Sequence, residues 1–325
     1  MRRILAVLAI PALASVALAG CSSSKPTAAA ATNTNATVTA TGSFGKAPTV
    51  SIPKAKASSS LTVKTLINGN GPALSKTEQF LGNYVVYSWD GTNHALKGST
   101  YTSAPTLFTS PLLPGLQTAL TGKPVGSRVL AVIPPKQGFG TNGNPNAGIT
   151  GTTTLVFVID VLKAFNGKEA ASGTQQSTGG AGLPTVTEPI KAGTAPTVTI
   201  PPSSVKPPTT LQVKTLIKGS GPAVAKGDAV VVQYVGYIWR TGKVFDSSWS
   251  RNADFGFTDG SNPSQVIPGW DTGLVGQTVG SRVLLVIPPK DGYGSSGASQ
   301  AGIKGTDTLV FVVDIIDAVS PSSAH

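Results

Sequence analysis

The sequence predicts a mainly β, α+β fold of two similar domains, each an antiparallel sheet wrapped around one short helix. Three observations lead to this prediction. The chain repeats itself over about a hundred residues. Each copy contains several runs of alternating or β-branched apolar residues, which are typical of strands. Each copy has one short segment of helical character, and several strands with a single helix favour a sheet packed on that helix.

The first 21 residues have the pattern of an export signal. Arg2 and Arg3 precede an apolar run at residues 4–18, which is too short and too early to span a bilayer. The run leads into the sequence Leu-Ala-Gly-Cys, which resembles a bacterial lipobox and predicts that Cys21 is lipidated. An ordinary cleaved signal with an incidental cysteine is the alternative. Cys21 is the only cysteine of the chain, so disulfide bonds and thiol catalysis are excluded.

Two segments have the composition of tethers. Residues 22–60 are rich in Ser, Thr and Ala, and residues 166–210 add Pro and Gly, so a disordered stalk and a flexible linker are expected. The formal net charge is +11, and the two tethers together account for +5 of it, mostly in the stalk. The basic residues there either contact anionic lipid headgroups or only keep the stalk soluble. No patch interleaves basic and aromatic residues, so a nucleic-acid partner is not expected.

The repeat places two domains at residues 61–165 and 211–319, followed by a tail at residues 320–325. A repeating unit of about a hundred residues indicates a duplicated domain rather than a solenoid. A shorter motif, APTVSIP at residues 47–53, recurs as APTVTIP at residues 195–201. The main matching segments are 61–76 with 211–226, 126–136 with 280–290, and 148–160 with 302–314.

The second domain shows the expected elements most clearly. A strand at residues 229–239 places Val232 and Tyr234 on one face, and Gly242 follows in a hairpin turn. One short helix is expected at residues 269–275, before the next glycine. Further strands are expected at residues 211–217, 281–287 and 308–316.

Few residues of this chain can carry acid–base or metal chemistry. His94 and His325 are the only histidines, so a catalytic triad, a zinc site and a histidine base are excluded. No glycine-rich nucleotide motif opens a helix after a strand. We expect no metal and no cofactor.

Aromatic residues are concentrated in the second domain, within about eighty residues. They accompany one carboxylate, Asp246, in the sequence Val-Phe-Asp-Ser-Ser. A single aromatic residue is usually just core, so the order and spacing of the whole set must decide. The set is Tyr234, Phe245, Trp249, Phe255, Phe257, Trp270, Tyr293 and Phe311.

This order resembles the FKBP-type peptidyl-prolyl cis/trans isomerases over residues 219–316. The resemblance implies two FKBP-like domains, since the first domain repeats the same strand pattern. The motifs that carry it are QYVG at 233–236, GKVFDSS at 242–248, VIPGW at 266–270, VGSR at 279–282, IPP at 287–289, GYG at 292–294 and TLVF at 308–311.

The resemblance also implies a pocket for the substrate proline. Trp270 would form its floor, and Asp246 would lie at its rim with Arg251 as ion partner. The Tyr293 hydroxyl and the Ile267 backbone N–H would donate hydrogen bonds to the peptide. The implied catalytic residues are Phe245, Asp246, Trp270 and Tyr293. The other implied substrate-binding residues are Tyr234, Phe255, Val266, Ile303 and Phe311.

The available residues fit this chemistry. Rotating an X-Pro bond breaks amide resonance, against a barrier of roughly 18–20 kcal/mol. The planar amide is more polar than the twisted one, so a dry apolar pocket disfavours the ground state. Fixed donors and a carboxylate then favour the twisted carbonyl. The reaction needs no nucleophile, so the lack of catalytic histidine and cysteine is no objection.

The first domain departs from the pattern at the pocket. Leu116 stands where Trp270 stands, and Phe139 replaces Tyr293 and loses the hydroxyl. The nearest match to the Phe-Asp-Ser-Ser motif predicts Lys97 in place of the acid. We therefore expect the first domain to bind proline segments weakly or not at all and hardly to catalyse.

The leading hypothesis is an exported prolyl isomerase, anchored to the cell membrane by its lipid, that helps other exported proteins to fold. It would act as a monomer on their proline-containing segments, and macrolide immunosuppressant-type ligands would fit the same pocket. The alternative is a non-catalytic proline-peptide-binding or envelope scaffold lipoprotein. Solute binding has little support, because two small barrels do not form a hinged cleft.

Overall fold

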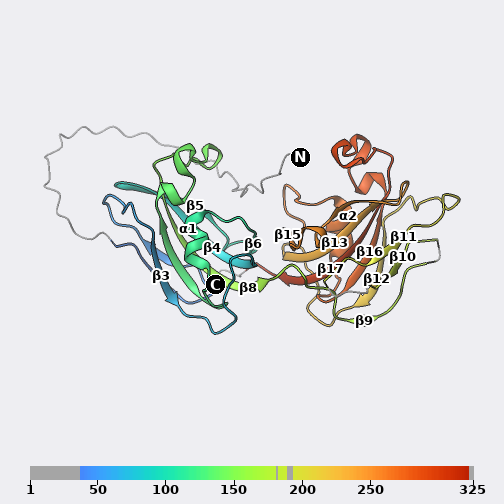
Figure 1. Cartoon of the computed structure of the whole chain (residues 1–325), viewed down its shortest axis with the longest axis horizontal. Helices are drawn as coiled ribbons and strands as arrows, with labels where there is room; N and C mark the ends of the chain where they lie inside the picture. Colours follow the sequence, from blue (N-terminus) through green and yellow to red (C-terminus); the bar gives the residue numbers. More distant parts are fainter. Residues whose placement is uncertain (1–36, 181, 189–192, 322–325) are drawn as a thin grey trace.

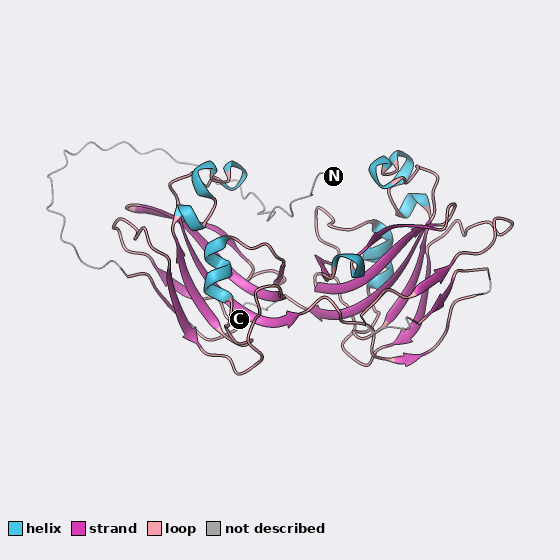
Figure 2. Ribbon diagram, in the orientation of Figure 1, coloured by secondary structure: helices cyan, strands magenta, loops and turns pink. Residues whose placement is uncertain are grey.

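The computed structural model describes residues 37–180, 182–188 and 193–321, which form two domains of one fold (Figure 1). In each domain an antiparallel sheet curves around one short α-helix (Figure 2). The predicted fold class is therefore confirmed. The predicted signal peptide, with Cys21, lies outside the described residues. Within the described part of the chain, neither α-helix has the length and apolar character needed to cross a membrane.

The first domain contains a sheet in the order β3-β7-β8-β4-β5, with β6 paired to β4. Three 3-10 turns connect β7 to β8, at residues 135–137, 140–142 and 145–147. The elements are β3 (Thr62–Ile67), β4 (Gln79–Asp90), β5 (Asn93–Ser99), β6 (Thr106–Phe108), α1 (Pro114–Leu120), β7 (Arg128–Ile133) and β8 (Thr154–Phe165).

The second domain repeats this plan in the order β14-β13-β17-β16-β12-β9, with β15 paired to β13. The expected strands and the expected helix are all present, within a few residues of their predicted ends. The elements are β9 (Thr174–Gln175), β12 (Gln212–Lys218), β13 (Ala229–Ile238), β14 (Lys243–Ser247), η4 (Trp249–Arg251), β15 (Phe255–Thr258), α2 (Pro268–Leu274), β16 (Arg282–Ile287), η5 (Pro289–Asp291), η6 (Gly294–Ser296), η7 (Ser299–Ala301) and β17 (Leu309–Val319).

Helix α2 packs directly against strand β16 of the sheet. It begins at Pro268, whose fixed φ and missing N–H suit the first helical turn. Gly269 and Gly273 face β16, where an added Cβ would come within 2.7 Å of Ile287 and 2.8 Å of Leu285. These glycines therefore let the helix backbone approach the strands and carry its other side chains deep into the core.

The prediction of a disordered stalk at residues 22–60 is wrong for residues 37–60. Strands β1 (Thr39–Thr41) and β2 (Thr49–Ser51) form a hairpin. Its apolar residues pack on the outer face of the first sheet, in a cluster that contains Val38, Ile52, Val85, Trp89 and Leu130. Burial of alternate valine and isoleucine side chains thus orders a segment whose average composition is polar.

The prediction of a free linker at residues 166–210 is wrong for its described part. Strands β10 (Thr185–Thr187) and β11 (Thr197–Thr199) form the equivalent hairpin on the second domain, and β9 extends the second sheet beside β12. Val186 and Val198 pack against the outer face in one cluster with Leu216, Trp239, Trp249 and Leu284. Each domain therefore includes a leader hairpin, defined as β1–β2 or β10–β11.

A buried ion pair lies beside each leader hairpin. Arg128 pairs with Asp160 on the neighbouring strand at 2.6 Å and donates to the carbonyl of Gly42 in the β1–β2 loop. Arg282 pairs with Asp314 at 2.7 Å and also with Glu188, next to β10. Burying such charges is favourable only when hydrogen bonds satisfy them, and the leader segments supply part of those bonds.

The two domains contact each other through equivalent elements, β6 and β15 (Figure 1). Leu107 of β6 lies on the backbone of Gly256, where an added Cβ would sit 2.6 Å from it. The Gln79 side chain binds both backbone groups of Asp254, donating to its carbonyl at 2.9 Å and accepting from its N–H at 2.6 Å. The apolar residues buried at this contact include Leu81, Ala104, Phe165, Ala229 and Val231.

The same contact buries a carboxyl group. Asp254 is 4% exposed, and its carboxyl lies beside that of Glu169. Burial, and then the charge of Glu169, raise the pKa of Asp254 to about 7. In the unfolded chain this group titrates near pH 4. Its protonated form therefore stabilises the folded state below about pH 4, and this contribution is lost as the pH rises through about 7.

We therefore predict that Asp254→Asn flattens the pH dependence of stability. Between about pH 4 and pH 7, wild type should lose up to roughly 1.4 kcal/mol per pH unit through this group, and the variant should not. Urea unfolding at pH 5 and pH 8 measures the difference, with Asp90→Asn at an exposed position as the control. Equal pH dependence in wild type and Asp254→Asn would contradict the assignment.

Candidate active site of the second domain

Trp270 of α2 is buried beneath a cage of aromatic rings. Tyr234 from β13 and Phe311 from β17 each lie 5.2 Å from it, centroid to centroid, at interplanar angles of 85° and 87°. Phe255 and Phe257 from β15 lie at 6.1 Å and 5.8 Å, also edge-on. Edge-to-face packing of this kind is favourable for aromatic rings. Three strands and one helix thus converge on the predicted pocket floor.

Phe245 belongs to the same aromatic group. It occupies a β-bulge, where the register between β13 and β14 shifts, and its ring lies 5.5 Å from Phe311 at 86°. An added Cβ on Gly236 would lie 2.8 Å from both rings. Gly236 therefore leaves the space that this ring pair occupies.

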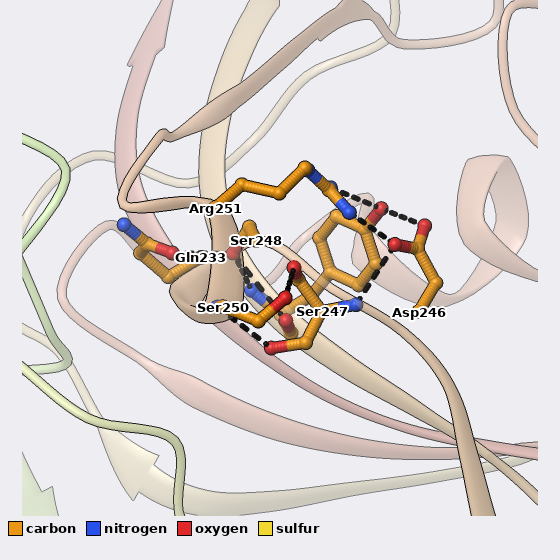
Figure 3. Close-up of polar contacts among 7 residues, drawn as sticks. Gln233, Asp246, Ser247, Ser248, Ser250 and Arg251 are labelled. Carbon is orange, nitrogen blue, oxygen red and sulfur yellow. Dashed lines mark hydrogen bonds and ion pairs between the residues drawn. The ribbon is translucent and has the colours of Figure 1, made fainter. Parts of the chain in front are cut away.

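Asp246 lies at the edge of the aromatic group and is held by three residues. The Tyr234 hydroxyl donates to one carboxylate oxygen, and Arg251 forms an ion pair with the other (Figure 3). The Ser247 backbone N–H donates to Asp246 at 2.8 Å, and Arg251 also donates to the Tyr234 hydroxyl at 2.9 Å. The Asp246 side chain remains 38% exposed, so a fixed carboxylate faces solvent at the rim.

The environment of Tyr234 keeps it a hydrogen-bond donor. Burial, followed by its hydrogen bond to Asp246, raises the pKa of the Tyr234 hydroxyl well above its ordinary value. The guanidinium of Arg251 also lies 5.7 Å from the centre of the Tyr234 ring. These three side chains therefore form one polar unit with a defined direction of hydrogen bonding.

The remaining predicted site residues belong to, or lie close to, the core cluster around Trp270. Val266 and Ile267 are half-buried against the core, and Ile303 is buried in it. The Ile267 N–H, just before α2, has no acceptor among the described residues. Tyr293 is 42% exposed, and burial and the charge of Asp246 raise its pKa. The predicted site residues of the second domain thus lie in or beside the core cluster that contains Trp270.

The candidate site has the carboxylate of Asp246 at its rim. Within the described residues, no three histidine, cysteine or carboxylate side chains lie close enough together to hold a metal ion. The candidate site offers an apolar wall, a carboxylate and hydrogen-bond donors.

Comparison with known proteins identifies the fold family. The family model described as "FKBP-type peptidyl-prolyl cis-trans isomerase" matches residues 80–162 and 221–316, which together make up more than half of the chain. The chain belongs to this family. The two matched segments correspond to the two domains of the structure, so both are FKBP domains.

Individual relatives cover different parts of this FKBP chain. It is 41% identical over 111 residues to "FK506-binding protein" of Streptomyces anulatus, across 34% of this chain and 88% of that protein. It is 28% identical over 259 residues to "Peptidyl-prolyl cis-trans isomerase FKBP9" of Homo sapiens, across 78% of this chain. The match spans only 38% of the length of that human protein. A solved structure of three FKBP domains of wheat FKBP73 is 23% identical, covers 80% of this chain and 95% of that chain, and has a TM-score of 0.32.

The first FKBP domain lacks this pocket chemistry. Leu116 of α1 occupies the place of Trp270, and Phe108 stacks on Phe80 at 4.6 Å beside it. Phe139, half-buried against the core, occupies the place of Tyr293. The first domain therefore retains an apolar core at the equivalent position without the indole floor.

The predicted replacement of the acid by Lys97 is wrong. In the second domain Asp246 pairs with Gly236, and in the first domain Gly98 pairs with Val86 at the equivalent register. Gly98 therefore stands in place of the acid. Lys97 falls in the bulge, where the second domain has Phe245, and donates to the Gly148 carbonyl at 3.1 Å. Both hairpins have the bulge at the same place, so Lys97 aligns with Phe245 and Gly98 with Asp246, one residue further along than predicted.

Two polar residues behind the pocket were missed at the sequence level. Gln233 and Ser248 are both fully buried and hydrogen-bonded to each other. The motifs QYVG and FDSS contain them, but nothing in the sequence indicates that their side chains meet.

Proposed function

We propose that the second domain catalyses cis/trans isomerisation of X-Pro bonds and that the first domain is weak or inactive. One observation carries the proposal. The second domain joins an indole floor, Trp270, to a fixed rim carboxylate, Asp246. The first domain has Leu116 and Gly98 at those places.

The pocket suits a proline ring and a twisting amide. The ring would lie on Trp270 among apolar walls, where burial of its methylene groups favours binding. The Ile267 N–H and the Tyr293 hydroxyl would donate to carbonyl oxygens of the peptide. Asp246, fixed by Tyr234 and Arg251, supplies a preorganised charge near the rotating bond. Contacts that are stronger to the twisted amide than to the planar one lower the barrier.

The decisive variants copy the first domain into the second. In a prolyl isomerisation assay on the full chain, Trp270→Leu and Asp246→Gly should each lower kcat/KM by at least about tenfold, the equivalent of roughly 1.4 kcal/mol of transition-state stabilisation. The control variants Lys97→Ala and Phe139→Ala, at the equivalent rim of the first domain, should change it by less than about twofold. An inactive wild-type chain would instead favour the non-catalytic scaffold.

We further propose that the same pocket binds macrolides. The Streptomyces relative, of which this chain covers 88%, is described as FK506-binding. A titration with FK506 should give a saturable change in tryptophan fluorescence, because Trp270 would lie under the ligand. The change should be absent in Trp270→Leu. A signal that survives this substitution would place the ligand elsewhere.

We propose, finally, that the protein works outside the cytoplasm on exported polypeptides, as a membrane-anchored folding helper. The signal pattern at residues 1–21 and Cys21 support this. X-Pro isomerisation takes tens to hundreds of seconds and can limit folding, so an exported isomerase would be useful. Cys21→Ser should move the protein from the membrane fraction to the soluble fraction. An unchanged distribution would contradict lipid anchoring.

A further inference from the structure

The segment that leaves the first domain is seated against the rim of the second-domain pocket. We call residues 166–169 the connector and residues 248–254 the rim loop. Gly167 of the connector has a positive φ of 74°, and an added Cβ would lie 2.3 Å from the Asn252 carbonyl oxygen. Asn252 itself has a positive φ of 49° and directly follows Arg251. The connector backbone therefore packs tightly on the loop that carries the ion partner of Asp246.

Gln233 joins the connector to this loop from the sheet side. Its side chain is fully buried on β13 and donates to the Gly167 carbonyl at 2.8 Å. Its amide oxygen accepts from the Ser248 hydroxyl. Figure 3 shows Gln233 and Asp246 at opposite ends of the polar network, with Ser248 between them. One amide thus binds both the connector and the first residue of the rim loop.

Ser248 connects Gln233 to the residues that hold the Asp246 carboxylate. The Tyr234 backbone N–H donates to its hydroxyl at 2.7 Å, and its own N–H donates to the Tyr234 carbonyl at 3.0 Å. The Arg251 N–H donates to the Ser248 carbonyl at 3.0 Å. Both side-chain partners of Asp246, Tyr234 and Arg251, are therefore bonded through their backbones to Ser248.

We propose that Gln233 is a positioning residue, through which the connector sets the geometry of Tyr234, Asp246 and Arg251. This inference rests on the proposed isomerase function of the second domain. It gives the first domain a role that does not require a pocket of its own. The first domain anchors the connector, and the connector holds the catalytic rim in place.

The first domain contains a matched control for this network. Asn83 and Thr100 occupy the places of Gln233 and Ser248, and the Thr100 hydroxyl donates to Asn83 at 3.1 Å. The Tyr84 N–H donates to the Thr100 hydroxyl at 2.9 Å. This network lies beside Gly98 rather than a carboxylate, so disrupting it leaves the catalytic rim untouched.

The test is a double-mutant cycle in the full chain. Gly167→Ala displaces the connector by its Cβ, and Gln233→Glu keeps the acceptor for Ser248 but loses the donor to Gly167. Each should lower kcat about three- to tenfold, within the range seen for mutations along a coupled network. KM and the Trp270-dependent binding of FK506 should stay unchanged, because the pocket floor is intact. Asn83→Leu should change kcat by less than about twofold.

The double variant separates positioning from general destabilisation. If both substitutions break the same link, the double variant should be no slower than the slower single variant. Additive losses, a rise in KM together with the fall in kcat, or an unchanged kcat in Gly167→Ala would overturn the inference while leaving the proposed function standing. An inactive wild-type chain would overturn both.

Discussion

The edge-on packing of Trp270 among the aromatic rings of three strands is the interaction on which the second domain depends. The same indole fills the core beneath the sheet and would form the floor of the proposed pocket. This is possible because Gly269 and Gly273 let α2 approach β16 closely. The rim chemistry follows from the same arrangement, because Tyr234 contacts Trp270 with its ring and Asp246 with its hydroxyl.

The duplicated first domain shows that the fold does not require the indole and the carboxylate of the proposed pocket. It keeps the sheet order, the helix and the buried Arg128–Asp160 pair, which corresponds to Arg282–Asp314. Leu116 replaces the indole, and Gly98 replaces the acid. The strand pattern therefore specifies the architecture, whereas the proposed pocket differs between the domains at a few positions, on α2, on β14 and at Tyr293. In this protein the first domain contributes packing at β6 and a connector that reaches the rim.

The strands, the helix and the aromatic set could be predicted from sequence because they rest on alternation and on the order of large side chains. The leader hairpins could not be predicted from composition, because their few valine and isoleucine residues lie among many Thr, Ser and Ala. The repeated APTV motif was the available signal for them. Lys97 was placed one residue out, because the first domain has no carboxylate in this segment to mark the alignment, and only the strand pairing shows that Gly98 matches Asp246. The contact of Gln233 with Gly167 joins residues 66 apart in the chain, and no local pattern indicates it.

The central claim is that proline isomerisation takes place over Trp270 in the second domain. Exchange NMR on the full chain with an X-Pro peptide tests it directly. The chain has four tryptophans, so each indole N–H signal reports on a different part of the structure. The account predicts faster cis/trans exchange of the peptide together with a saturable shift of the Trp270 signal. The signal of Trp89, on the outer face of the first domain, should not move. Faster exchange without a Trp270 shift, or a shift without faster exchange, would contradict the account.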